Sequence, residues 1–342
     1  MPRLFQDMPS ITVISTVLNE ARGIDALVDS LARQTLQPAE IVMVDGGSTD
    51  GTWEKLQAAQ SRCPLLRPIR DESCNLRASL GPISRGRNVA ISLAKSAIIA
   101  CADAGCTYRP DWLAELTAPI VGGEAEYALG GSCIGHEGRT VWDIAAAPFL
   151  GIHLSPDART RSCTARSMAF TKRLWQWAGG FPESSFMIDD AGYDLRVRRG
   201  YRPAFVRNAK AFYAPHHTLR SALVQLARYA FGDGVSGHRW ARLGRNLARC
   251  LAWIGAVALL RWSFVALIAV VLLEIYFALR LDWRGFRQEL SRRTLGARLL
   301  YSFLVPWVVA WNQIEGMVRK VNPPNAQNAA LRGPKQGSGA RG

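Results

Sequence analysis

The sequence lacks several patterns that would place it in well-known classes of protein. Its seven cysteines form no CxxC pair and no Cys/His spacing of a metal site, which argues against a zinc site or a disulfide framework. No GxGxxG follows the first predicted strand, where Leu18-Asn19-Glu20 stands instead, so a dinucleotide-dependent oxidoreductase is excluded. We expect the cysteines to be reduced, as in a cytosolic protein.

Acidic residues are scarce in the second half of the chain. Between Arg196 and Arg249 there are twelve Lys or Arg and one acid, Asp233, and residues 280–298 add six Arg. Such a stretch favours contact with nucleic acid or with an anionic membrane surface. No helix-turn-helix, zinc-finger or RNA-binding signature is present, and long apolar runs flank the basic residues. Membrane lipids are therefore the expected partner, and nucleic acid is not expected.

The apolar runs occupy residues 251–279 and 299–311. The first is too short for two spans of ~20 residues each. A single transmembrane helix over 262–279, a re-entrant hairpin bent near Arg261 and an in-plane arrangement stay open as alternatives. We expect a basic, membrane-associated helical segment at 236–320 and a disordered tail, rich in Pro, Gly and Asn, at 321–342.

The N-terminal sequence MPRLFQDMPS has no apolar region typical of a signal peptide. The expected location is therefore the inner membrane, with the catalytic part in the cytosol.

The first 105 residues alternate between strand and helix patterns. Strands are predicted at 11–17, 41–44, 65–69 and 97–102, with a helix at 83–94 before the last of them. This order favours an α/β fold, a Rossmann-like sandwich with a mostly parallel central sheet. Ligands of such sheets bind beyond the carboxyl ends of the strands, where Glu20, Asp45 and Asp103 stand. A turn role would also explain Asp45, because Asp-Gly-rich turns are common.

Two blocks of sequence carry a resemblance to a known family. The block from Val13 to Glu20 and the block Val44-Asp45-Gly46-Gly47-Ser48-Thr49-Asp50-Gly51-Thr52 resemble the opening of a family-2 glycosyltransferase of the GT-A fold. Arg85-Gly86-Arg87-Asn88-Val89-Ala90 resembles the helix before that family's donor motif. The resemblance covers residues 10–235, so a catalytic domain is predicted at 1–235.

The resemblance implies how a nucleotide-sugar donor is held. Asn19, Glu20 and Asp45 are the residues expected at the nucleotide base and ribose, because carboxylates accept hydrogen bonds from N–H and hydroxyl groups. Asp103 is the residue expected at the ribose or the metal. Arg85 or Arg87 is expected to share the charge of the diphosphate.

The donor motif departs from the family pattern. The family carries Asp-x-Asp and a divalent metal, Mg²⁺ or Mn²⁺, whereas this chain has Asp103-Ala104-Gly105. Asp103 is therefore the expected metal ligand, and the missing carboxylate at Gly105 leaves metal dependence open. His217 is a second candidate ligand, beside its default interpretation as a core or surface histidine.

An acidic pair supplies the candidate general base. Asp189-Asp190, followed by Leu195 to Tyr201, resembles the family's acidic pair at a helix start. By this resemblance Asp190 is the base, with Asp189 as the alternative. A base is needed because the acceptor hydroxyl loses its proton as it attacks the anomeric carbon, and a neighbouring carboxylate raises the apparent pKa of such a pair. An acidic first helical turn would explain the same residues.

A third motif lies in the basic half of the chain. Gln225-Leu226-Ala227-Arg228-Tyr229 resembles the Gln-x-x-Arg-Trp motif of polysaccharide-making relatives, which implies donor contacts for Gln225, Arg228 and Tyr229. The region is similar to membrane-anchored exopolysaccharide glycosyltransferases of the succinoglycan type. The expected function is the inverting transfer of a UDP-linked sugar to a lipid-linked or polysaccharide acceptor at the cytoplasmic membrane face. The alternative is a catalytically inactive, glycosyltransferase-like scaffold that binds nucleotide or glycan in a membrane assembly complex.

Overall fold

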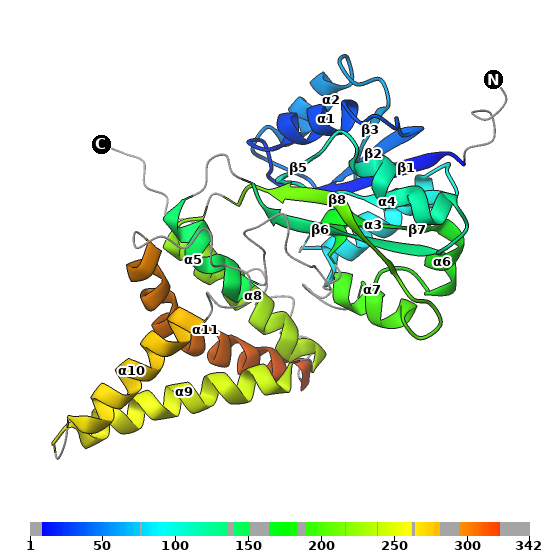
Figure 1. The fold of residues 1–342 in the computed structure, drawn as a ribbon. Helices are drawn as coiled ribbons and strands as arrows, with labels where there is room; N and C mark the ends of the chain where they lie inside the picture. Colours follow the sequence, from blue (N-terminus) through cyan, green and yellow to red (C-terminus); the bar gives the residue numbers. More distant parts are fainter. Residues whose placement is uncertain are drawn as a thin grey trace, which may run out of the picture.

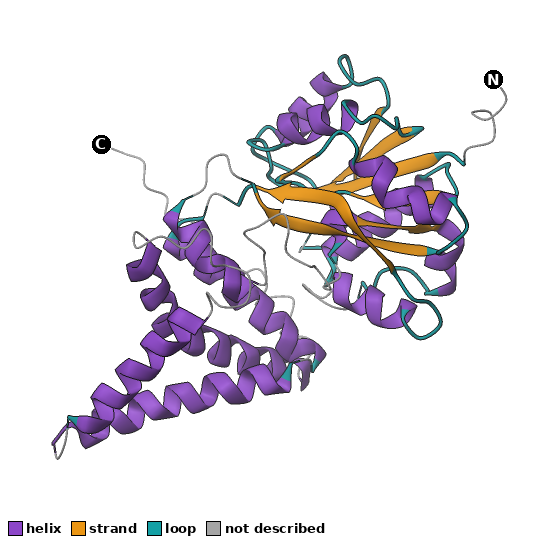
Figure 2. Cartoon of the chain, viewed as in Figure 1, coloured by secondary structure: helices purple, strands orange, loops and turns teal. Residues whose placement is uncertain are grey.

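The computed structural model describes residues 9–75, 77–135, 140–150, 164–183, 189–215, 217–237, 239–261, 264–280 and 294–321. Within these ranges the chain forms an eight-stranded sheet covered by helices and a separate group of long helices. Figures 1 and 2 show the helical group beside the sheet. The tail predicted at 321–342 lies outside the described residues, apart from Val321, which ends the last helix.

The first half of the sheet is parallel, as predicted. Its strands β1 (Ile11–Val17) and β2 (Glu40–Asp45) are apolar runs buried on both faces. β1 pairs with β2 and with β4 (Ile98–Cys101), and β2 pairs with β3 (Leu66–Arg70). The connecting helices are α1 (Ile24–Ala32), α2 (Thr52–Ala59), the 3₁₀ turn η1 (Glu72–Cys74) and α3 (Pro82–Leu93).

The second half of the sheet corrects the prediction of a mostly parallel sheet. The strand order is β3-β2-β1-β4-β7-β6-β8-β5. β7 (Met168–Thr171) is antiparallel to β4 and to β6 (Tyr127–Ile134), and β5 (Cys106–Tyr108) is antiparallel to β8 (Ala204–Tyr213). β6 and β8 are parallel. After β6 the chain enters α5 (Val141–Leu150), which packs in the helical group (Figure 1).

Apolar side chains fill both faces of the sheet. Val13 and Met43 face the layer formed by α1, α2 and α4 (Trp112–Val121). Ile14 and Val44 face the opposite layer, formed by α3, α6 (Lys172–Trp177) and α7 (Asp189–Val197). The alternation along β1 and β2 therefore fixes which helices cover each face and brings the starts of α3 and α7 to one side of the sheet.

The helical group contains α5, α8 (Leu219–Ser236), α9 (Trp240–Ala258), the 3₁₀ turn η3 (Leu259–Arg261), α10 (Val265–Arg280) and α11 (Leu295–Val321). The backbones of α8 and α11 approach closely at glycines. A Cβ atom at Gly234 would lie 2.1 Å from the carbonyl oxygen of Gln313, and one at Gly316 would lie 2.2 Å from that of Phe231. The domain boundary predicted at residue 235 falls at the end of α8, which packs with α5 and α11.

Three helices of this group expose an unusual amount of apolar surface. No helix among the described residues is both long and apolar enough to cross a membrane. The large apolar side chains exposed on α9, α10 and α11 include Ile254, Val257, Val265, Ile268, Leu272, Trp311 and Val318. Inside the same helices, the guanidinium of Arg249 forms an ion pair with Glu274 and donates to Ser302 Oγ at 2.9 Å. A polar cluster thus lies inside the helical group, while part of its outer surface is apolar.

Candidate active site

The Asp45–Thr52 block is hydrogen-bonded to the loop that follows β1. Asn19 has a positive φ of 56°. Its backbone N–H donates to Ser48 Oγ at 2.9 Å, and its side-chain oxygen accepts from the Thr49 N–H at 2.9 Å. The N–H of Glu20 donates to Thr52 Oγ1 at 2.8 Å. The block thus fixes the orientation of Asn19 and Glu20.

Asp45 is hydrogen-bonded within the same block. Its side chain is fully buried, and it accepts hydrogen bonds from the Ser48 N–H at 3.0 Å and from the Ser48 hydroxyl at 2.5 Å. Of the two roles open to Asp45 in the sequence, the structure shows the turn role, and its contact with a nucleotide stays a prediction.

A cleft of about 820 Å³ opens at the carboxyl ends of β1, β6 and β8. The lining residues include Asn19, Glu20, Asp50, Gly105, Phe212 and Pro215. The predicted donor residues Asn19 and Glu20 therefore share one cleft with Gly105, the glycine of the donor motif. Burial, followed by the charges of Asp50 and Asp103, raises the pKa of Glu20 to about 7.

The donor motif borders this cleft. The N–H of Asp103 donates to the hydroxyl of Tyr108 at 2.9 Å. Gly105 has a φ of 71°, which disfavours other residues. A Cβ atom at this position would lie 3.5 Å from Tyr213 Cε2 and 4.0 Å from Glu20 Oε2. The family's second aspartate would therefore project between the Tyr213 ring and the Glu20 carboxylate.

Arg87 gathers three carboxylates from two distant parts of the chain. The Arg87 side chain is 4% exposed. Nη2 donates to Asp103 Oδ1 at 2.8 Å, and Nη1 donates to Asp190 Oδ1 at 2.7 Å and forms an ion pair with Asp189. The donor motif and the candidate base are thus joined through one guanidinium. Because these three acids occupy it, Arg87 does not offer the free charge that the sequence suggested for the donor diphosphate.

The geometry favours Asp190 over Asp189 as the base. The side chain of Asp190 is 24% exposed and that of Asp189 is 13% exposed. Asp190 Oδ2 also accepts from the Ala165 N–H at 2.9 Å, which fixes its orientation. Burial and the adjacent charge of Asp189 raise the pKa of Asp190 to about 6, against the opposing effect of Arg87. A carboxyl group with that pKa can accept a proton near neutral pH.

Arg85 lies two residues before Arg87 but has different partners. Its Nε donates to Ser73 Oγ at 2.8 Å, and its Nη1 lies 3.2 Å from Glu183 Oε2. Arg85 therefore lies beside η1 and forms a half-exposed ion pair with Glu183. A contact of Arg85 with the donor stays a prediction.

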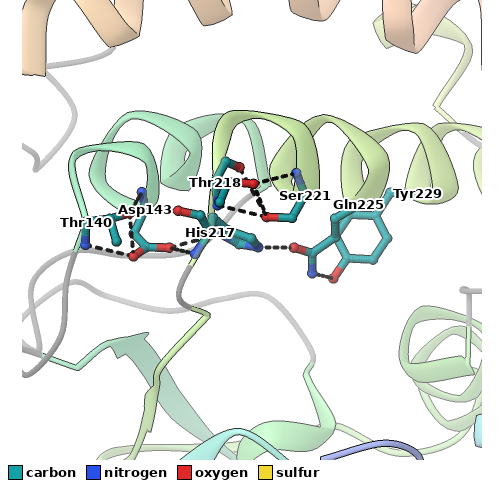
Figure 3. A network of polar contacts seen from close by, with 7 residues as sticks. All are labelled: Thr140, Asp143, His217, Thr218, Ser221, Gln225 and Tyr229. Atoms are coloured by element: carbon teal, nitrogen blue, oxygen red, sulfur yellow. Dashed lines mark hydrogen bonds and ion pairs between the residues drawn. The ribbon is translucent and has the colours of Figure 1, made fainter. Parts of the chain in front are cut away.

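His217 lies in a polar network between α5 and α8 (Figure 3). Its backbone N–H donates to Asp143 Oδ1 at 2.7 Å, and its ring Nδ1 lies 3.1 Å from the same oxygen. Ring Nε2 lies 2.6 Å from Gln225 Oε1, and the Gln225 amide donates to the Tyr229 hydroxyl at 3.1 Å. Gln225 and Tyr229 thus contact each other, whereas Arg228 is exposed on α8, and donor contacts of all three stay a prediction.

The structure brings His217 to Asp143 and Gln225, where both ring nitrogens face protein oxygens. Among the described residues, no group of three or more His, Cys, Asp or Glu could hold a metal ion. The two predicted ligands, Asp103 and His217, therefore do not belong to such a group.

Asp143 was missed in the sequence. The available signal was a capping box, since Thr140 and Asp143 stand at the first and fourth positions of Thr-x-x-Asp before an apolar run. The carboxylate accepts from the N–H of Thr140 at 2.9 Å, as that motif requires. Burial raises the pKa of Asp143, but hydrogen bonds from His217 and Thr140 outweigh it, and the net shift is downwards.

Comparison with known proteins identifies first the fold and then the family. The structure is similar to that of the mannosyltransferase PcManGT from Pyrobaculum calidifontis, with a TM-score of 0.50 and 19% identity, over 95% of this chain and 81% of that chain. This likeness establishes a GT-A-like α/β fold. The sequence model described as "Glycosyl transferase family 2" matches residues 12–147. Residues 12–147 of the chain therefore form a family-2 glycosyltransferase domain.

Two curated relatives extend this comparison. Validoxylamine A glucosyltransferase from Streptomyces hygroscopicus subsp. jinggangensis is 27% identical over 141 residues, which are 41% of this chain and 32% of that protein. Succinoglycan biosynthesis protein ExoA from Rhizobium meliloti is 26% identical over 253 residues, which are 66% of this chain and 68% of that protein. The match thus spans about a third of the glucosyltransferase and about two thirds of the succinoglycan protein.

Proposed function

We propose that the chain is a glycosyltransferase that moves a sugar from a nucleotide-sugar donor to an acceptor hydroxyl. The observation that carries this proposal is the arrangement around Arg87, which holds the donor-motif Asp103 and the candidate base Asp190 on one guanidinium. The cleft containing Asn19 and Glu20 borders the same motif at Gly105. The residues proposed to bind the donor and the residue proposed to accept the proton therefore lie near one another, as sugar transfer requires.

The proposed reaction is a single displacement that inverts the anomeric centre. Asp190 accepts the proton of the acceptor hydroxyl, whose oxygen forms the new bond to the anomeric carbon. The bond from that carbon to the donor phosphate oxygen breaks, and the nucleoside diphosphate leaves with the electron pair. A UDP-linked sugar is the first donor to test. A GDP-linked sugar comes next, because the Pyrobaculum mannosyltransferase was solved with GDP-Man and Mn²⁺.

The described residues do not fit a metal site of their own. Asp103 contributes one carboxylate, which already contacts Arg87, and position 105 has no side chain. His217 is held between Asp143 and Gln225. A requirement for Mg²⁺ or Mn²⁺ therefore stays a prediction from the family.

We further propose that the helical group lies on the cytoplasmic face of the inner membrane and brings the enzyme to a lipid-linked or polysaccharide acceptor. Two features support this. The outer faces of α9, α10 and α11 are apolar, with Val265 71% exposed and Ile268 56% exposed. Arg245 is exposed on the N-terminal half of α9, and the exposed Arg239 lies directly before this helix, so these two charges suit anionic headgroups.

The catalytic proposal is tested by nucleotide release. The purified full chain is incubated with UDP-, GDP- and dTDP-sugars, with lipid-linked and glycan acceptors, and with Mg²⁺, Mn²⁺ or chelator. Acceptor-dependent release from one donor is the expected result. Binding of a donor without release across the whole acceptor panel would contradict the enzyme and favour a nucleotide-binding scaffold.

The membrane proposal is tested by flotation of the full chain with phosphatidylglycerol vesicles. The double variant Val265→Glu/Ile268→Glu is expected to lose most of its vesicle binding, because each charge must enter the lipid interface. Leu93→Glu, at the exposed end of α3, serves as the control and should float like the wild-type chain. Equal flotation of the double variant would overturn the proposed orientation.

A further inference from the structure

Arg166 is a half-buried arginine beside the donor motif. It lies in the 3₁₀ turn η2 (Ala165–Ser167), directly before β7. Its guanidinium carbon lies 4.5 Å from the centre of the Tyr213 ring. In the part of the chain that the structure describes, no carboxylate forms an ion pair with Arg166. A half-buried guanidinium without an ion-pair partner among the described residues is available to an anion from outside the protein.

Two sets of contacts tie Arg166 to the donor motif. Its carbonyl oxygen accepts from the Tyr108 hydroxyl at 3.0 Å, and that hydroxyl accepts from the N–H of Asp103. The Tyr213 ring that Arg166 contacts also lies 3.5 Å from the Cβ position of Gly105. The Tyr213 ring therefore lies between Arg166 and the position where the family's second aspartate would project.

The two arginines of α3 beside the site are already engaged, and Arg22, which lines the cleft, is exposed. Arg87 contacts three carboxylates and is 4% exposed. Arg85 forms an ion pair with Glu183. Of Arg85, Arg87 and Arg166, the last has a guanidinium without an acidic partner among the described residues, and its planar fork suits phosphate oxygens.

We propose that Arg166 binds a phosphate group of the nucleotide-sugar donor and neutralises the charge of the departing diphosphate. This role compensates for the carboxylate that Gly105 lacks. The inference rests on the proposed function, since it places the donor's phosphates at the Gly105 end of the cleft. Tyr213 holds the guanidinium at this position through its ring face.

The test compares nucleoside diphosphates with nucleosides as probes. Calorimetry on the full chain in detergent measures binding of UDP, GDP, uridine and guanosine, with and without chelator. Arg166→Gln is expected to weaken diphosphate binding by about 10- to 100-fold, the usual effect of losing a hydrogen bond to a charged group. Nucleoside binding should not change, because the base and ribose contacts are untouched. The diphosphate affinity of Arg166→Lys should lie between those of the wild-type chain and Arg166→Gln, since lysine keeps the charge but lacks the planar guanidinium.

Two controls distinguish the loss of a phosphate contact from a general loss of folded protein. Arg62→Gln removes a surface arginine that pairs with Asp25 and Asp29, and it should bind the probes like the wild-type chain. Thermal unfolding of Arg166→Gln identifies a folding defect, and such a defect would weaken nucleoside binding as well.

The contrary outcomes are distinct. Equal diphosphate affinity in wild type and Arg166→Gln would overturn the role of Arg166 while leaving the proposed function intact. Weaker binding of farnesyl phosphate in Arg166→Gln, with unchanged diphosphate affinity, would assign the arginine to an acceptor phosphate and overturn the donor assignment. Failure of the wild-type chain to bind any nucleoside diphosphate would contradict both the inference and the proposed function.

Discussion

Replacing Arg87 with methionine should destabilise the fold strongly and in a pH-dependent way. The side chain is 4% exposed and neutralises Asp103, Asp189 and Asp190. Methionine keeps much of the volume but leaves three carboxylates without a cation. Breaking a buried ion pair from one side costs about 3–5 kcal/mol. Arg85→Met, on the same helix, removes a half-exposed pair and should cost at most about 1 kcal/mol.

The pH dependence follows from Asp190. Its pKa of about 6 is raised above the ordinary value of 3.8 by burial and by Asp189, while Arg87 opposes that rise. Without Arg87 the folded-state pKa moves further up. A raised folded-state pKa of an acid means that stability is present at low pH and is lost as pH rises through that pKa. The difference in the free energy of unfolding between the wild-type chain and Arg87→Met should therefore be small near pH 5 and should widen from about pH 6 upwards.

Urea unfolding followed by tryptophan fluorescence at pH 5, 6, 7 and 8 measures this difference. Arg85→Met, measured in parallel, shows what an arginine on α3 contributes without the acidic cluster. If Arg87→Met loses no more stability than Arg85→Met, or if its deficit does not depend on pH, the reasoning about the buried cluster is wrong.

Three further predictions concern neighbouring parts of the site. UDP binding should weaken below pH 7, by up to about tenfold per pH unit, as Glu20 takes up a proton, and Glu20→Gln should remove this dependence in calorimetry at pH 6 and 8. His217→Ala should lower stability by about 1–3 kcal/mol, because Gln225 loses its partner, while Mn²⁺ titration should give the wild-type affinity. A lower Mn²⁺ affinity would show that His217 is a ligand after all. Gly105→Val should cost about 1–2 kcal/mol in urea unfolding, because its φ of 71° strains a side chain; an unchanged midpoint would contradict that.

The strands of the first half were predictable because their signal is local. β1 and β2 are short, continuous runs of β-branched and other apolar residues, and each is buried on both faces. The direction of β7 had no such signal. β7 pairs antiparallel with β4 over four residues, which are too few to carry a pattern that sets the direction of a strand.

The sequence could name candidate site residues one by one but not the contacts between them. Resemblance pointed to Asp103 and Asp190, and both lie at one site. That Arg87 joins them was not visible, because its partners are 16, 102 and 103 positions away along the chain. The partner of His217 is 74 positions away, so its pairing with Asp143 could not be separated from a metal role. Contacts between residues so far apart in the sequence arise from the fold as a whole.

The steady-state rate of Asp190→Asn tests the central claim most directly. The variant keeps the shape of the side chain but cannot accept the acceptor's proton, whereas Asn19 and Glu20, the residues proposed to contact the donor, are unchanged. Asp194→Asn, on the same helix, changes a residue that pairs with Arg198 and serves as the control. We predict that kcat of Asp190→Asn falls by about 100- to 10,000-fold, with unchanged binding of nucleoside diphosphate and a wild-type rate for the control. A kcat close to that of the wild-type chain would contradict the assignment of Asp190 as the base.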